Sequence, residues 1–234
     1  MTSGEPERAA RAEMVLRELW KAYEQLVAAR RASVCAPGCQ ACCSDRVLLT
    51  TLEGRLLAAE LERSGQGALL ARAARASVGP GPACTFNALA RACLEGREPP
   101  ADPPPQTPPG RCLLLVEGLC AAYAARPLAC RVMASQSRCQ AGGTALQDPW
   151  WLTVDTAFLQ INEQVDAGGG LGWLPTVLAS LGAGDQELLP SCQNLAGLPA
   201  PPQHQERLNN LLMQVFSRSL DGQPLGLWIN QLRV

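Results

Sequence analysis

The sequence contains little histidine and almost no net charge. His204 is the only histidine among 234 residues, so a histidine-rich zinc site or a Cys/His catalytic pair has little to draw on. It lies among glutamines at the start of an expected helix, where we expect a solvated side chain. Lys and Arg number 20 against 21 Asp and Glu, a net charge of -1. Such a chain has no long-range field to attract nucleic acid or an anionic membrane, so neither is an expected partner.

Long apolar segments are also missing. The longest largely apolar run, residues 112–125, is short for a bilayer span and contains Glu117. Residues 1–12 carry four charged side chains in place of the apolar stretch of a secretory signal. We therefore expect a cytoplasmic protein without a membrane helix.

Aromatic residues make up only 4% of the chain, and Ala, Leu, Arg and Glu outnumber the β-branched residues. This composition favours helices over sheets. We expect a mainly α fold: a compact helical domain with irregular cysteine-rich loops around a metal site. Its expected parts are an amphipathic lead-in helix (1–32), a cysteine-cluster metal-binding domain (33–140) and a helical carboxy-terminal region packed on it (141–234).

The spacing of apolar residues predicts the helices. Residues 5–31 carry an apolar stripe at helical intervals, formed by Leu16, Leu19, Trp20, Tyr23, Leu26 and Val27. Thr50 and Glu53 form a capping-box signature that opens a helix to about residue 63, after a short extended piece at 47–49. Asp148 and Pro149 begin a helix with a second stripe, formed by Trp151, Val154, Phe158, Ile161 and Val165. Further helices are expected over 68–77, 86–95, 174–181 and 203–220, and a helical turn after Arg126-Pro127.

Proline is concentrated in residues 98–110, which contain seven prolines. That density excludes helix and sheet and predicts a semi-rigid exposed connector. Directly after it come more cysteines, so we interpret the segment as a spacer that returns the chain to the metal site.

The chain has eleven cysteines, and eight of them fall into two groups. The first group is C-x3-C-x2-C-C, formed by Cys35, Cys39, Cys42 and Cys43, and the second is formed by Cys112, Cys120, Cys130 and Cys139. Thiolates are soft ligands that suit zinc and iron–sulfur clusters. An odd number of cysteines in a reducing compartment favours metal binding over a disulfide framework.

The sequence leaves the choice of metal open. A zinc site here would be all or mostly cysteine, and such closed sites are structural, whereas a 4Fe–4S cluster can leave one iron free for a substrate. Eight ligands permit one centre or two. Adjacent side chains point in different directions, so Cys42 and Cys43 can serve different sides. Arg126, Arg131 and Arg138 lie within the second group, where they could offset thiolate charge.

Cys35, Cys39 and Cys42 also reproduce the cysteine spacing of radical S-adenosylmethionine enzymes. Those enzymes usually have an aromatic residue before the last cysteine, where this chain has Ala41, and a barrel strand before the loop, where this chain is expected to be helical. The spacing alone therefore gives little support to that reaction.

Taken together, the two groups resemble the YkgJ-type cysteine-cluster family of zinc- or iron-chelating proteins over about residues 33–140. The first half matches in C-x3-C-x2-C-C, a short apolar stretch, Thr50 and Glu53. The second half matches in four short elements: Cys112–Leu115, Cys120–Tyr123, Arg126-Pro127 and Cys130-Arg131. Cys139 matches a further cysteine less specifically. Leu113 and Ala122 stand where the family often has Pro and Ile, and neither change removes a ligand.

The resemblance implies metal or cluster binding by both cysteine groups. The family also looks related to flagellin lysine N-methylases, which implies, as an alternative, methyl transfer from S-adenosylmethionine to a protein lysine at an iron–sulfur cluster. A third hypothesis is a zinc-stapled helical domain that docks a protein partner through the Trp151 stripe or the carboxy-terminal helix. Cys84, Cys93 and Cys192 lie outside the matched motifs, and we expect them to be buried free thiols.

Overall fold

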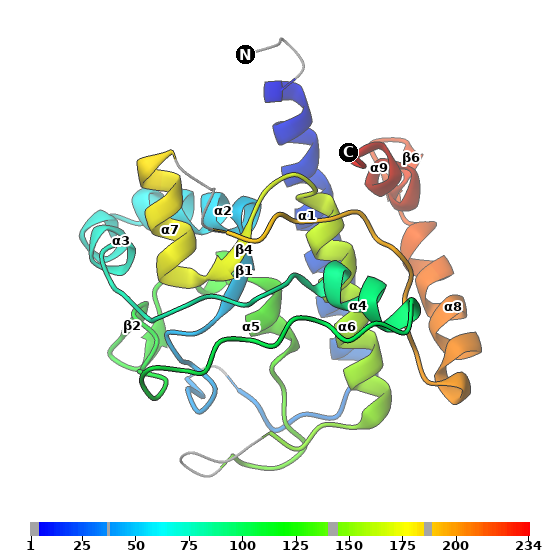
Figure 1. Ribbon diagram of the computed structural model, residues 1–234, viewed down its shortest axis with the longest axis horizontal. Coiled ribbons are helices and arrows are strands. Elements are labelled where there is room, and N and C mark those ends of the chain that lie inside the picture. Colours follow the sequence, from blue (N-terminus) through cyan, green and yellow to red (C-terminus); the bar gives the residue numbers. More distant parts are fainter. Residues whose placement is uncertain (1–4, 37, 140–144, 185–188) are drawn as a thin grey trace.

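The computed structural model describes residues 5–36, 38–139, 145–184 and 189–234. The described chain is mainly helical, as predicted, with small two-stranded sheets between the helices (Figure 1). The helices are α1 (Glu5–Arg30), α2 (Thr51–Arg63), α3 (Gly67–Ala74), α4 (Phe86–Leu94), α5 (Leu128–Val132), α6 (Pro149–Val165), α7 (Leu174–Ala183), α8 (Pro202–Phe216) and α9 (Leu225–Gln231), with a 3-10 turn η1 (Tyr123–Ala125). The strands are β1 (Leu48–Thr50), β2 (Leu115–Val116), β3 (Leu119–Cys120), β4 (Leu171–Trp173), β5 (Ser219–Leu220) and β6 (Gln223–Pro224).

One hydrophobic cluster forms where α1 and α6 pack against each other and α8 and α9 cover them (Figure 1). The rings of Tyr23 and Phe158 meet edge to face at its centre, 5.0 Å apart. All five residues of the Trp151 stripe are buried here, so this face belongs to the core and is not exposed for docking a partner. Burial of this kind, at about 25 cal/mol per Å² of apolar surface, is the main stabilisation of the helix pair.

A second cluster joins α2, α3 and α7 around the antiparallel pair of β1 and β4. Gly54 on α2 permits a close approach to α7, because a Cβ atom there would lie 2.7 Å from the Val177 side chain. The apolar residues of 112–122 cover the same cluster from the side of the second cysteine group. The second cysteine group is thereby anchored to a packed core through Cys112 and Cys120.

Most predicted helices lie where the apolar spacing placed them, and the differences come from turns. The capping box of Thr50 and Glu53 is present at the start of α2. Helix α8 ends at Phe216 rather than 220, because Asp221 and Gly222 adopt positive φ angles in the tight turn between β5 and β6. Glu117 and Gly118 make a similar turn between β2 and β3, within a run for which no strand was predicted.

The proline-rich connector has neither helix nor strand over residues 98–110, and nearly all of its side chains are exposed. It ends where Gly110 and Asp45 exchange backbone and side-chain hydrogen bonds of 2.9 and 3.1 Å. A Cβ atom on Gly110 would lie 2.5 Å from the Asp45 carboxylate, so a larger residue there would displace the Asp45 side chain. The connector therefore does return the chain to the first cysteine group.

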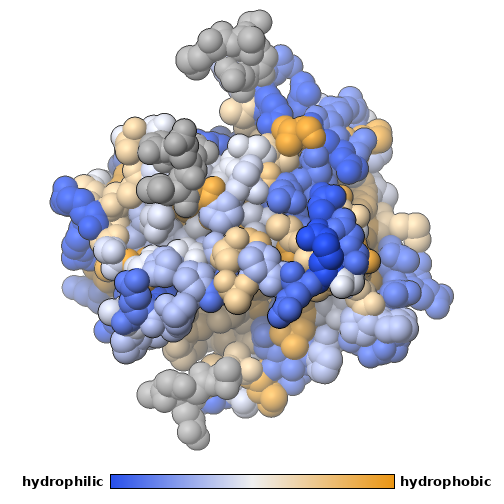
Figure 2. All heavy atoms as spheres, viewed as in Figure 1, coloured by the Kyte–Doolittle hydropathy of each residue, from blue (hydrophilic) through white to orange (hydrophobic). Residues whose placement is uncertain are grey.

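On the face seen in Figure 2, hydrophilic residues are interspersed with hydrophobic ones rather than separated into one apolar patch. No helix among the described residues combines the length and apolar character needed to cross a bilayer.

Candidate metal centre

The first cysteine group lies on an exposed loop between α1 and β1. Two tight turns shape it: the Cys39 N–H donates to Ala36, and the Cys43 N–H donates to Gln40, at 2.9 and 3.1 Å. Cys35, Cys39 and Cys42 are exposed, whereas Cys43 is half-buried. Only the last residues of this loop therefore face the body of the protein.

The second cysteine group meets the first through the backbone. The Cys112 N–H donates to the Cys43 carbonyl at 3.1 Å, and Ser44 forms a β-bridge with Arg111. Cys120 pairs with Leu115 in the hairpin of β2 and β3. Cysteines that are far apart in the sequence thus lie on adjacent backbone segments.

Five thiols share one electrostatic neighbourhood. The adjacent side chains of Cys42 and Cys43 act on each other: Cys43 raises the pKa of Cys42, and Cys42 lowers the pKa of Cys43. Three cysteines of the second group also raise the pKa of Cys43 electrostatically: Cys112, Cys120 and Cys130. We call these five residues the thiol neighbourhood.

Burial keeps the inner thiols of this neighbourhood protonated. It is the largest cause that raises the pKa of the Cys112, Cys120 and Cys130 thiols. Mutual repulsion between thiolates raises the pKa of Cys130 further. These thiols stay neutral on their own, and a bound cation would reverse the balance because it favours the thiolate form.

Glu53 joins the two segments that carry the cysteine groups. It is 2% exposed, and its carboxylate accepts hydrogen bonds from the N–H groups of Thr50 and Leu128, at 2.9 and 2.7 Å. Leu128 begins α5, which carries Cys130. The capping residue of α2 therefore also fixes the position of a candidate ligand.

Arg126 and Arg131 have partners other than the thiols. Both guanidinium groups pair with Glu24 on α1, and Arg131 also stacks on Trp20, 4.3 Å from the ring centre. Arg126 does lower the pKa of Cys120, although less than burial raises it. Glu24 was not identified from the sequence. Its position could have indicated it, because an acidic residue four positions after Trp20 lies on the face that α1 buries.

The other candidate ligands lie outside the thiol neighbourhood. The Cys35 sulfur accepts a hydrogen bond from the Ser135 N–H at 3.3 Å. Cys39 is exposed on its turn, and Cys139 is half-buried just before residues 140–144, which the structure does not describe. No hydrogen bond of the described residues joins Cys39 or Cys139 to the five thiols.

Three expectations on single residues need correction. Of the thiols expected to be buried, Cys192 is buried, but Cys84 is half-buried and Cys93 is exposed, because α4 turns Asn87, Ala90 and Ala92 inward instead. His204 is not simply solvated: its Nδ1 atom lies 2.8 Å from the Thr153 hydroxyl, and its ring packs edge-on against Trp150.

All eleven cysteines are free thiols. Within the described ranges, no three Cys, His, Asp or Glu side chains are arranged to hold a metal ion. The donor atoms are nevertheless of the kind that zinc and iron–sulfur clusters bind as thiolates, since none of these cysteines has a disulfide partner. No family model, curated protein or solved structure matches this chain.

Proposed function

We propose that the protein binds zinc or an iron–sulfur cluster through cysteines of both groups. The observation that supports this best is the thiol neighbourhood, in which the Cys43 carbonyl accepts from the Cys112 N–H and the Cys43 thiol is affected electrostatically by Cys112, Cys120 and Cys130. Free cysteines scattered by chance have no reason to gather from four backbone segments.

Cys43, Cys112, Cys120 and Cys130 are the four residues we propose as principal ligands. They are held by β2, β3, α5 and the Cys43–Cys112 backbone bond. Cys42, on the 35–43 loop, is an alternative ligand to Cys43. Cys35, Cys39 and Cys139 are more peripheral candidates, available to a second centre or to a larger cluster.

Metal binding would require movement of more than one segment, because no three Cys, His, Asp or Glu side chains of the described residues are arranged to hold an ion. Three of the four proposed ligands, Cys112, Cys120 and Cys130, lie outside the 35–43 loop, so their segments would have to approach one another as well as Cys43. When bound, the metal supplies cross-linking of these segments, and an iron–sulfur cluster adds electron transfer or an open iron site.

The test is metal analysis of the full chain purified without oxygen, combined with its absorption spectrum. Stoichiometric iron with acid-labile sulfide and a brown colour supports a cluster. Colourless protein with stoichiometric zinc supports a structural site, and its removal by a chelator should then lower the melting temperature. Protein that contains neither metal, and takes up neither on reconstitution, contradicts the proposal.

A further inference from the structure

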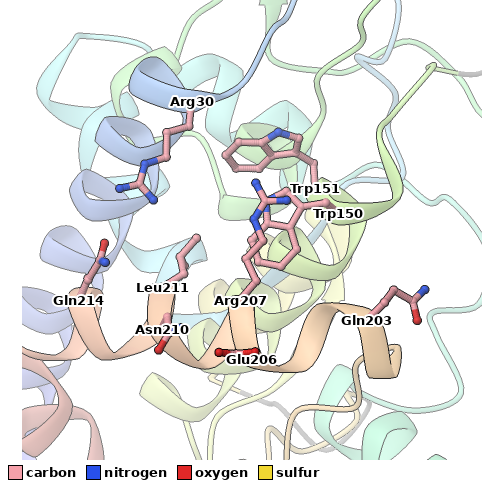
Figure 3. A pocket seen from close by; sticks show the side chains of 9 residues that line it. All are labelled: Arg30, Trp150, Trp151, Gln203, Glu206, Arg207, Asn210, Leu211 and Gln214. Carbon is pink, nitrogen blue, oxygen red and sulfur yellow. The ribbon is translucent and has the colours of Figure 1, made fainter.

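A pocket of roughly 340 Å³ lies between the end of α1, the start of α6 and one stripe of α8 (Figure 3). Its walls include two indoles, two guanidinium groups and one carboxylate: Trp150, Trp151, Arg30, Arg207 and Glu206. Figure 3 shows Arg30 reaching down from α1 and Arg207 rising from α8 toward Trp150. The volume is near the lower limit of about 300–1,000 Å³ that ligand pockets occupy, so it fits a small ligand only.

The two arginines of this pocket carry charge that the protein does not neutralise. Among the described residues, neither Arg30 nor Arg207 forms an ion pair. The adjacent Arg31 differs, because its side chain is 3% exposed and pairs with Asp155 at 3.0 Å. With Glu206 as the acidic lining residue, two positive charges face one negative charge, which leaves one in excess.

The indoles form a fixed wall. The Arg207 guanidinium lies 4.0 Å from the Trp150 ring centre, and His204 packs against the same ring at 5.5 Å. Trp151 is packed by Arg31 at 5.2 Å. Both indoles are buried, so their positions are set before any ligand arrives. A flat ring inserted beside Arg207 would gain stacking on a guanidinium plane.

We propose that this pocket binds a small aromatic anion, a planar ring that carries a phosphate or a carboxylate. The anionic group lies between Arg30 and Arg207, which approach from opposite helices and each offer a charge-assisted hydrogen bond. The ring lies toward the indoles of Trp150 and Trp151. The site is independent of the cysteine region and of any metal.

Isothermal titration of the full chain tests this with adenosine 5′-monophosphate and indole-3-carboxylate, a phosphate probe and a carboxylate probe. Adenosine and indole are the uncharged matches. We expect saturable binding of at least one anion and at least tenfold weaker binding of its uncharged match. Arg30→Gln and Arg207→Gln should each weaken the anion about tenfold or more, since a charge-assisted hydrogen bond is lost.

Arg75→Gln is the control, because it removes the same charge at the exposed end of α3, away from the pocket. It should leave binding unchanged, and equal melting temperatures establish that all three variants are folded. The proposal is overturned if neither anion binds, if the uncharged match binds equally well, or if Arg75→Gln weakens binding as much as the two pocket variants.

Discussion

The Glu53 carboxylate lies 2.7 Å from the backbone nitrogen of Leu128, which is 75 residues further along the chain. The same carboxylate caps α2 by accepting from the Thr50 N–H. One buried side chain thus joins the start of α2, next to the first cysteine group, to the start of α5, which carries Cys130. This bond makes the relative position of the two groups depend on a residue that is not itself a ligand.

Replacing Glu53 with glutamine should therefore destabilise the protein by about 1–3 kcal/mol. Glutamine offers one acceptor oxygen, and its amide hydrogens would face the second backbone N–H, which would stay buried and unsatisfied. Urea unfolding measures the change. Glu62→Gln, on the exposed side of the same helix, is the control and should change stability by less than about 0.5 kcal/mol. Equal effects of the two variants would contradict the role given to Glu53.

Gly110→Ala should displace the connector from Asp45. A Cβ atom there would lie 2.5 Å from the carboxylate, so Asp45 must move, and the Cys43–Cys112 backbone bond two residues away should weaken with it. We expect a loss of about 0.5–1.5 kcal/mol, the contribution of the Gly110–Asp45 hydrogen bond, and weaker metal retention. Gly81→Ala is the matched control, since nothing lies within 4 Å of its added Cβ atom. A Gly110→Ala variant as stable as Gly81→Ala would argue against this close contact.

Glu163 predicts a pH dependence of stability. Burial raises the pKa of its carboxyl, although the N–H groups of Gln193 and Asn87 oppose the shift. At pH values between the unfolded pKa of about 4.3 and the raised pKa of the folded state, the folded protein holds a proton on Glu163 that unfolding releases. The stabilisation is therefore complete below the unfolded pKa and is lost as pH rises through the folded pKa.

Comparison with Glu163→Gln isolates this effect, because glutamine cannot titrate and the other carboxyls contribute equally to both proteins. The free energy of unfolding of the unmodified protein, measured relative to the variant, should fall as the pH increases from about 4. A difference that rises over this range would show that the folded protein favours the ionised carboxylate.

Much of the fold could be predicted because helical periodicity is a local signal. The Trp151 stripe and the capping box of Thr50 and Glu53 each follow from residues three or four apart. The pairing of β1 with β4 joins residues more than 120 positions apart, as in Leu48 opposite Trp173, and no local pattern specifies it. Asp221-Gly222, directly after the range predicted as helix, is a turn signal that the sequence already carries.

The sequence predicted that cysteines form the candidate site, but not which of them come together. Spacing drew attention to both cysteine groups, and the chain brings five of the eight thiols into one neighbourhood. The turns of the 35–43 loop leave Cys39 exposed, which sequence spacing could not indicate. The supports of the site, Glu24 and the Leu128 N–H, act through tertiary contacts and through backbone atoms that carry no sequence signal.

The most direct test of the account is the metal content of paired variants. Cys42→Ser with Cys43→Ser removes the first group's share of the thiol neighbourhood, and Cys112→Ser with Cys120→Ser removes two thiols of the second group. Cys84→Ser with Cys93→Ser is the control, outside both groups. If one centre uses both groups, each of the first two pairs should lose most of the bound zinc or iron, and the control should keep it. Full metal content in either group's variant would contradict a shared centre.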